Sequence, residues 1–160
     1  MENRKKTLEK ARQYGLRLLG YRPRSQIEFQ RRLQKQGFCD EVVNSLVEEF
    51  KDKGLLDDKK FASLWANRRF LTSLHGISFI KAELSAKGLG PDIIKEAIAE
   101  IKAGASEEDI ARELLKKRTR LLEKGLSSKK AEIRLYSYFK RHGFSDDIIY
   151  KLLDSIKNSV

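Results

Sequence analysis

Apolar residues recur along this chain at the spacings of amphipathic helices, and no alternating apolar and polar run is long enough to suggest a half-buried strand. Three segments align without a gap when Gly37, Gly88 and Gly143 are superimposed. The shared apolar positions lie four residues apart before each glycine, and they step by one, three, one and three after it. Each segment is therefore predicted to form two helices with one buried stripe each, joined by a turn at the glycine.

The aligned positions carry the same physical type of residue in all three segments, which predicts a repeated core. We expect each glycine to end the first helix of its pair in the left-handed conformation, which glycine adopts at little cost. The apolar sets are Phe29/Ile80/Leu135, Leu33/Leu84/Phe139, Phe38/Leu89/Phe144, Val42/Ile93/Ile148, Val43/Ile94/Ile149, Leu46/Ala97/Leu152, Val47/Ile98/Leu153 and Phe50/Ile101/Ile156.

A further helical segment precedes each pair, at residues 7–21, 58–74 and 107–125. We therefore predict an all-α fold of three tandem three-helix repeats. The predicted domains are residues 1–56, 57–105 and 106–160. Because the boundaries are too short to act as free linkers, neighbouring repeats should pack on one another and form an elongated curved array.

Local signals support these helix starts. The spacings of Ser25–Glu28 and Ser106–Asp109 match the capping box, and Pro91 suits the first position of a helix. Asp57 and Asp58 form a pair of adjacent carboxylates just before a helix. We interpret both as N-terminal capping residues that interact favourably with the helix dipole.

Charge points to an anionic partner. The chain of 160 residues has 34 lysines and arginines against 23 acids, a formal net charge of +11. The excess is +5 in residues 1–56, +2 in residues 57–105 and +4 in residues 106–160, so both ends are more basic than the middle. This distribution favours nucleic acid first and an acidic protein surface next.

The sequence offers no constellation of reactive side chains. His75 and His142 each adjoin a glycine in a predicted turn, where we expect exposed polar residues. Cys39, the single cysteine, rules out an internal disulfide and has no second cysteine with which to form a zinc site. No glycine-rich phosphate loop is present. We predict no catalytic activity and no cofactor or metal ion.

The chain has no apolar run near the roughly 20 residues that span a bilayer, and residues 1–13 lack the apolar core of a signal peptide. These features predict a cytoplasmic protein that does not bind membranes, and we expect it to be a monomer.

Basic residues gather in three clusters. Runs of charge are usually solvated faces, but the first and third clusters contain few acids. Arginine predominates in the first, which suits forked hydrogen bonds to phosphate or carboxylate. Phe61, Trp65 and Phe70 recur at helical spacing, which favours core packing over stacking on bases. The clusters are Arg17, Arg22, Arg24, Arg31, Arg32 and Lys35; Arg68 and Arg69; and Arg112, Lys116, Lys117, Arg118, Arg120, Lys124, Lys129 and Lys130.

Four stretches carry a resemblance to a known family: "LLGYRPRSQIEFQRRLQKQGF", "GLLDDKKFASLWANRR", "HGISFIKAELSAKGL" and the weaker "YSYFKRHGFSDDII". Across roughly residues 8–156 the chain resembles RecX, the bacterial regulator of the RecA recombinase. Phe29 stands where the family more often has leucine, which is a conservative change.

The resemblance implies a curved all-α protein without catalysis. Such proteins dock in the groove of the RecA filament on single-stranded DNA, hinder its growth, and lower its ATPase, strand-exchange and coprotease activities. This would place the chain in DNA repair, the SOS response and homologous recombination. We hypothesise that the first and third clusters make the electrostatic contacts, while the middle repeat acts as spacer and filament-contact surface. The candidate residues for binding the filament or DNA are Arg22, Arg24, Arg31, Arg32, Lys35, Arg68, Arg69, Lys116, Lys117, Arg118, Arg120 and Lys124.

Two other classes of function stay open on the sequence. A sequence-tolerant nucleic-acid binder acting without RecA would bind DNA alone, with an affinity that falls steeply as salt rises. A purely structural helical adaptor would be indifferent to both salt and RecA.

Overall fold

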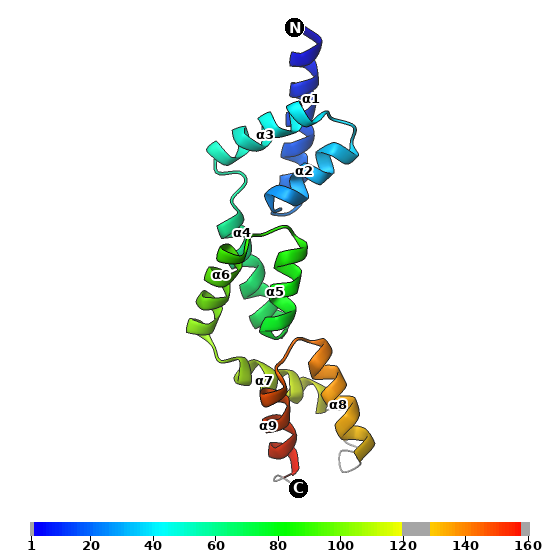
Figure 1. The fold of residues 1–160 in the computed structure, drawn as a ribbon, viewed down its shortest axis with the longest axis vertical. Helices are drawn as coiled ribbons and strands as arrows, with labels where there is room; N and C mark the ends of the chain where they lie inside the picture. Colours follow the sequence, from blue (N-terminus) through cyan, green and yellow to red (C-terminus); the bar gives the residue numbers. More distant parts are fainter. Residues whose placement is uncertain (1, 120–128, 158–160) are drawn as a thin grey trace.

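The structure, a computed structural model, describes residues 2–119 and 129–157. Within these ranges the chain forms nine α-helices and one π-helical turn, with no strand (Figure 1). The elements are α1 (Glu2–Tyr21), α2 (Gln26–Lys35), α3 (Asp40–Asp52), α4 (Asp58–Asn67), the π-helical turn η1 (Arg68–Thr72), α5 (Ile77–Ala86), α6 (Pro91–Gly104), α7 (Glu107–Thr119), α8 (Lys129–Arg141) and α9 (Asp146–Lys157).

The helices follow one another in three groups along the longest axis of the molecule (Figure 1). Helices α1–α3 lie at the N-terminal end, α4–α6 lie in the middle, and α7–α9 lie at the C-terminal end. This arrangement confirms the predicted all-α array of tandem three-helix repeats. The first, second and third repeats are these three groups of helices, and the boundaries at residues 57 and 106 stay a prediction.

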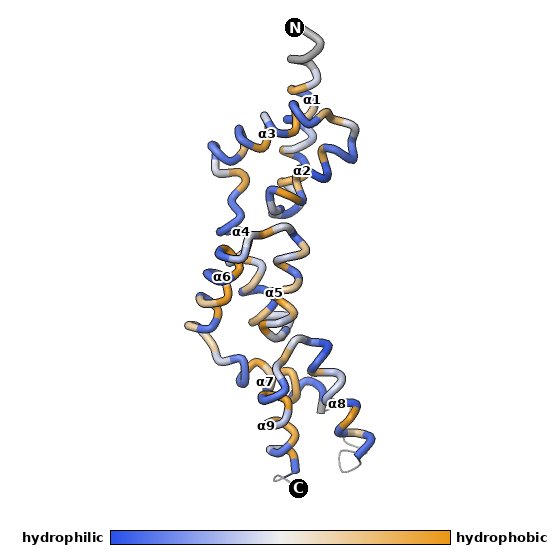
Figure 2. Tube along the Cα trace, viewed as in Figure 1, coloured by the Kyte–Doolittle hydropathy of each residue, from blue (hydrophilic) through white to orange (hydrophobic). Residues whose placement is uncertain are grey.

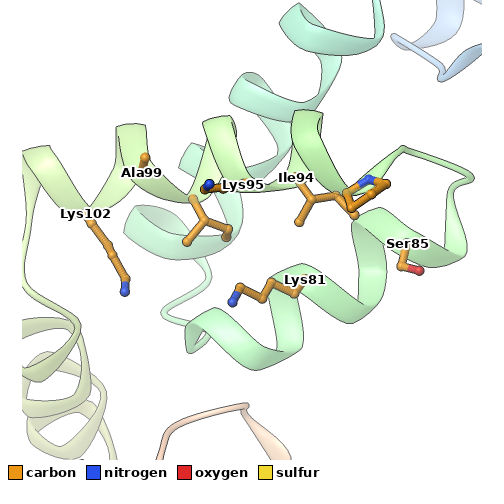
Figure 3. A pocket seen from close by; sticks show the side chains of 8 residues that line it. Lys81, Ser85, Ile94, Lys95, Ala99 and Lys102 are labelled. Carbon is orange, nitrogen blue, oxygen red and sulfur yellow. The ribbon is translucent and has the colours of Figure 1, made fainter.

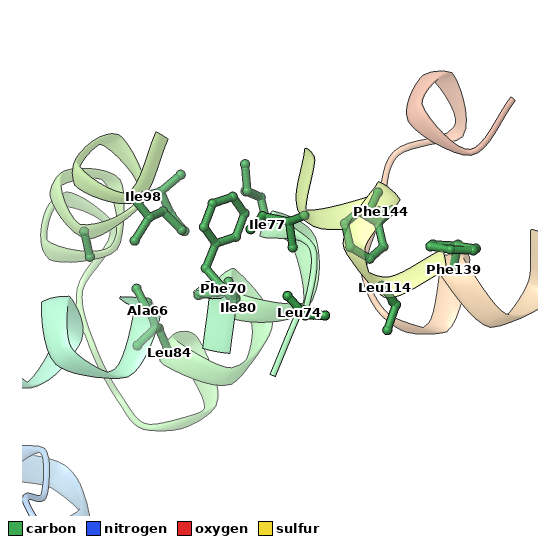
Figure 4. Close-up of a cluster of buried hydrophobic side chains, with 14 of the residues drawn as sticks. Ala66, Phe70, Leu74, Ile77, Ile80, Leu84, Ile98, Leu114, Phe139 and Phe144 are labelled. Atoms are coloured by element: carbon green, nitrogen blue, oxygen red, sulfur yellow. The ribbon is translucent and has the colours of Figure 1, made fainter. Parts of the chain in front are cut away.

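The aligned apolar positions form the core, as predicted. Phe29, Leu33, Ile80, Leu84 and Phe139 are each at most 2% exposed, and the other aligned apolar side chains are buried or half-buried. These residues belong to two clusters, one within the first repeat and one that runs from α4 to α9. Figure 4 shows side chains of the second and third repeats meeting in the larger cluster, with Ile77 and Leu74 facing Phe144 and Leu114. The second and third repeats therefore share one hydrophobic core.

The first helix of the second repeat differs from the single predicted helix over residues 58–74. Its α-helical part ends at Asn67, and the chain continues as the π-helical turn η1. After this turn, Leu74 takes a left-handed φ of 54°. Such a φ is costly for a side chain of this size, and burial of Leu74 in the shared core compensates for it. Phe61 and Phe70 are buried as predicted, whereas Trp65 lies half-buried at the edge of the core.

The three turn glycines have the predicted left-handed conformation, with φ of 92° at Gly37, 80° at Gly88 and 86° at Gly143. Two of them also lie against the preceding repeat. A Cβ atom on Gly88 would lie 2.7 Å from Ile27 of α2, and one on Gly143 would collide with the backbone of Phe79 in α5. At Gly37, no atom lies within 4 Å of the position that a Cβ atom would occupy. The turn of each later repeat is thus packed onto the second helix of the repeat before it.

Aligned positions are joined by a hydrogen bond at both of these joints, although the donor group differs. At the first, the Ser25 hydroxyl, which precedes α2, donates to the Lys87 carbonyl at 2.6 Å. At the second, the backbone N–H of Gly76, which precedes α5, donates to the His142 carbonyl at 2.7 Å. Lys87 and His142 each stand directly before their turn glycine, so the accepting carbonyl comes from the same repeat position at both joints.

Candidate partner-binding surface

Helix α2 presents three cations to solvent. Phe29 and Leu33 point into the core, which leaves Arg31, Arg32 and Lys35 exposed on the opposite side. None of these three forms an ion pair with any residue that the structure describes. A complete capping box between Ser25 and Glu28 fixes the start of the helix. Because the helix backbone is already fixed, binding of an anion there orders only the side chains.

The two arginines that precede α2 have partners of their own. Arg22 forms an ion pair with Glu28 at 3.2 Å. Arg24 is half-buried, and its Nε atom donates to the Leu18 carbonyl at 3.3 Å. Burial, together with the charges of Arg22 and Arg32, lowers the pKa of Arg24 below its usual value. Arg24 therefore supports the turn between α1 and α2 more than it presents charge to solvent.

An ion pair crosses the joint between the first and second repeats. The Lys87 ammonium lies 3.0 Å from a Glu28 carboxylate oxygen and 3.9 Å from the centre of the Trp65 ring. Although burial acts in the opposite direction, hydrogen bonds from Arg22 and Lys87 hold the pKa of Glu28 below its usual value. Glu28, singled out in sequence as a capping residue, is thus also a bridge between repeats.

The basic pair of the second repeat is split by the fold. Arg69 makes two hydrogen bonds of 2.7 Å to Glu83, and its guanidinium carbon lies 5.0 Å from the centre of the Trp65 ring. The Trp65 indole N–H donates to the same carboxylate at 2.9 Å. Arg68 is exposed and has no ion pair among the described residues. Arg69 therefore has its charge compensated within the second repeat, and only Arg68 remains available.

In the third basic cluster, some of the cations also have partners within the protein. Lys117 pairs with Glu113 at 3.1 Å, and the guanidinium of Arg118 lies 4.4 Å from the centre of the Tyr138 ring. Lys116 is exposed on α7. Two further candidates, Arg120 and Lys124, lie outside the described residues.

The fold also gathers cations that sequence reasoning did not single out. Lys81 on α5 and Lys95 and Lys102 on α6 line one groove, and Figure 3 shows Lys81 and Lys102 reaching toward it from facing helices. These residues are far apart in sequence and form no run, so no local cluster marked them. One signal was present: Lys95 and Lys102 are seven residues apart, which places them on one face of a helix.

The prediction of exposed histidines is wrong. His75 and His142 are half-buried at the joint between the second and third repeats, with ring centres 5.2 Å apart. The reason is the docked turn at Gly143, which carries His142 onto the segment before α5. Burial, with smaller contributions from His142 and Arg69, lowers the pKa of His75 below its usual value.

The two carboxylates of the predicted pair, Asp57 and Asp58, have different roles. Asp57 caps α4 as predicted, because its side chain accepts a hydrogen bond from the Lys60 N–H at 3.0 Å. Asp58 does not cap its own helix. It accepts from the N–H of Gln26 at 2.9 Å, across the joint with the first repeat, and burial raises its pKa. Tertiary packing turned the second carboxylate toward the start of α2.

Within the described residues no group of three or more histidines, cysteines and acids is placed to hold a metal ion. Cys39 is exposed just before α3. Figure 2 shows hydrophobic and hydrophilic residues interleaved along the helices, and no described helix is long and apolar enough to cross a membrane.

Comparison with known proteins places this chain in a family. Sequence models of the first and second three-helix domains of RecX match residues 11–50 and 57–98. The regulatory protein RecX of Mycobacterium sp. strain KMS is 35% identical over 143 residues, which cover 88% of this chain and 78% of that relative. The chain belongs to the RecX family. The RecX protein of Mycobacterium tuberculosis strain H37Ra is 32% identical, over 88% of this chain and 82% of its own length.

RecX crystal structures share the fold. RecX from Lactobacillus salivarius superimposes with a TM-score of 0.78 at 22% identity, over 95% of this chain and 97% of that one. A second RecX structure gives a TM-score of 0.77 over 93% of this chain and 72% of that one, at 21% identity. The curated RecX relatives are named regulatory proteins, so the chain is a member of a regulatory family, which fits the prediction of a non-enzymatic role.

Proposed function

We propose that this RecX-family chain docks on the filament that RecA forms on single-stranded DNA. There it hinders filament growth and lowers the ATPase, strand-exchange and coprotease activities. The family resemblance supplies the partner. The observation that carries the choice of surface is the unpaired state of Arg31, Arg32 and Lys35 on the outer side of α2, among the residues that the structure describes.

The shape of the molecule supports such a role. A filament of repeating protomers wound on DNA offers a long, curved and partly anionic groove. The array places exposed cations at intervals along its length, on α2, at Arg68 and at Lys116 and Lys117 of α7. A molecule held at several points can occupy contacts that the next protomer or the DNA would otherwise make.

The structure narrows the choice of residues to mutate. Arg24 holds the Leu18 carbonyl and Arg69 holds Glu83, so reversal of either would damage folding as well as binding. Reversal of the three α2 cations disturbs no ion pair among the described residues. The test variant is therefore Arg31→Glu, Arg32→Glu and Lys35→Glu combined.

We expect wild-type protein to inhibit RecA ATPase on single-stranded DNA, and the triple variant to need at least about tenfold more protein for the same inhibition. The control is Lys10→Glu, Lys51→Glu and Lys60→Glu, which changes three other exposed lysines and the net charge by the same amount. It removes one exposed ion pair, Lys51–Glu48 at 3.1 Å, and a pair of that kind contributes little to stability. The control variant should inhibit like wild type. Far-ultraviolet circular dichroism checks that helicity is equal in all three proteins.

A binding titration with single-stranded DNA alone, repeated as salt is raised, separates the alternative of a nucleic-acid binder acting without RecA. If DNA binding without RecA accounts for all of the inhibition, the filament is not the partner. If the α2 variant inhibits as strongly as wild type, α2 is not the contact surface.

A further inference from the structure

A groove between α5 and α6 combines positive charge with an apolar floor (Figure 3). Its volume is about 520 Å³, within the range of about 300–1,000 Å³ found for ligand-binding clefts. The floor is formed by Pro91, Ile94 and Ile98, and the rim by Lys81, Lys95 and Lys102. It lies in the second repeat, which the sequence led us to expect as spacer and filament-contact surface.

The three lysines have no ion-pair partner among the residues that the structure describes. The positions four residues away from Lys81 and from Lys95 within their helices are all uncharged. Asp92 lies three residues before Lys95, but the two form no ion pair among the described residues. Burial raises the pKa of Glu107, and the nearby charges of Lys102 and Lys81 only partly offset this rise. Its carboxylate already accepts the Ile77 N–H at 2.9 Å.

Interaction with a helix dipole explains the position of only one of the three lysines. Lys102 lies in the last turn of α6, where a cation is stabilised by the helix dipole. Lys81 and Lys95 lie in the N-terminal halves of α5 and α6, where the dipole gives a cation no such benefit. Three ammonium groups thus surround one groove, and two of them have no evident role in the stability of the fold.

The lining distinguishes between anionic partners. Proteins that hold single-stranded nucleic acid without sequence preference combine positive charge with aromatic side chains on which bases stack. No aromatic residue lines this groove, and its floor is aliphatic. Aliphatic floors between two helices, rimmed by charge, suit an amphipathic helix of opposite charge.

We propose that the groove between α5 and α6 docks an acidic amphipathic helix of a partner protein. The apolar face of that helix would lie on Ile94 and Ile98, and its carboxylates would pair with Lys81, Lys95 and Lys102. This surface is separate from α2, and it goes beyond the proposed filament contact.

The probe is a fluorescein-labelled peptide of about 15 residues, roughly 22 Å long as a helix, with leucines along one face and glutamates beside them. We expect fluorescence anisotropy to show saturable binding to the full chain. Lys81→Glu, Lys95→Glu and Lys102→Glu combined should weaken this binding at least about tenfold, because attraction becomes repulsion. The control Lys10→Glu, Lys51→Glu and Lys60→Glu should keep an affinity within about twofold of wild type, because its lysines lie outside the groove.

A second variant tests shape at constant charge. Ala99 is exposed and lines the groove, so Ala99→Trp should fill it without entering the core. We expect weaker binding of the amphipathic peptide and no change in helicity. A scrambled peptide of identical composition, which lacks the apolar face, should bind wild type more weakly than the amphipathic one.

The proposal is overturned if the peptide does not bind, or if groove and control variants bind it equally. It is also overturned if a labelled oligo-dT strand, and not the peptide, loses affinity in the groove variant, since the groove would then be a nucleic-acid site. No recombinase is present in this titration, so its outcome is independent of the proposed filament contact.

Discussion

Glu49 shows how single charged residues stabilise the first repeat. Arg12 of α1 donates to the two carboxylate oxygens of Glu49 at 3.0 Å and 2.8 Å, and Lys53 donates to one of them at 2.6 Å. These hydrogen bonds hold the pKa of Glu49 at about 2, well below its usual value of 4.5. The carboxylate thereby ties α1 to α3 across the repeat.

Because the folded-state pKa is lowered, the stabilisation is present above about pH 4.5 and is lost as the pH falls toward 2. Glu49→Gln should lower the free energy of unfolding by about 1 kcal/mol at neutral pH, since charge-assisted hydrogen bonds to a partly exposed group are lost. It should also flatten the decline of stability between these pH values. Urea unfolding followed by circular dichroism measures both effects. An equally steep acid decline in the variant would contradict the assignment.

At the residue scale, the sequence identified the charged side chains and the residues that cap helices. It could not show which charged side chains lack an ion-pair partner and can therefore contact another molecule. Arg31 and Arg69 look alike in sequence, since each has a second arginine beside it. The acid that compensates Arg69, Glu83, lies 14 residues away on another helix. Lys87 is likewise paired with Glu28, 59 residues away. Ion pairs of this kind depend on tertiary packing, so local composition cannot reveal them.

At the scale of elements, the three turn glycines offer a matched series. All have left-handed backbone, but only Gly88 and Gly143 face a neighbouring repeat, while Gly37 faces open space. All three turns therefore need a residue that adopts left-handed backbone readily. Only the two turns that pack on a neighbouring repeat also need a residue without a Cβ atom for lack of space.

Alanine in place of Gly37 should cost about 1–2 kcal/mol, because left-handed backbone is unfavourable for a residue with a Cβ atom. Gly88→Ala and Gly143→Ala should cost about 1–3 kcal/mol more, because the new methyl group overlaps Ile27 or the backbone of Phe79. Thermal or urea unfolding of the three single variants measures the difference. Equal destabilisation at all three positions would show that the docked turns can move apart without cost.

The helices themselves were largely predictable, because amphipathic spacing, capping residues and glycine turns all gave the same answer. The change to a π-helical turn after Asn67 was not, since the apolar spacing of residues 58–74 continues through it. The lysine groove was missed for a related reason. Its members come from α5 and α6, and only the packing of these helices brings Lys81 near Lys95 and Lys102.

At the scale of the whole molecule, the two joints share one geometry but differ in chemistry. The first is bridged by the Lys87–Glu28 ion pair, while the second brings His75 and His142 together and is continuous with the shared core. The repeat alignment predicted that neighbouring repeats pack on one another. It could not predict that the residue before the turn glycine would serve in both joints, because Lys87 and His142 differ in type.

The second joint should weaken in mild acid. The groups near His75 are Arg69, Glu83 and the half-buried His142 ring, which also contacts Tyr138. Tyr138 in turn lies against the Arg118 guanidinium, and the Glu107 carboxylate accepts the Ile77 N–H two residues from His75. Since burial lowers the pKa of His75, the open joint binds a proton more readily than the closed one. The stability of the joint is therefore greatest above about pH 6.5, the usual histidine value, and it falls as the pH drops below that value.

Two amides report on this opening, because the N–H groups of Gly76 and Ser78 donate across the joint to the carbonyls of His142 and Gly143. Their hydrogen-exchange protection, corrected for intrinsic rates, should fall between about pH 7.5 and about pH 5.5, by at most about tenfold for one histidine of ordinary pKa in the open state. The amide of Val43, inside the first repeat, serves as the internal control. His75→Gln should abolish the pH dependence at both reporters while leaving Val43 unchanged. If protection of Gly76 and Ser78 falls as much in the variant as in wild type, protonation of His75 is not what opens the joint.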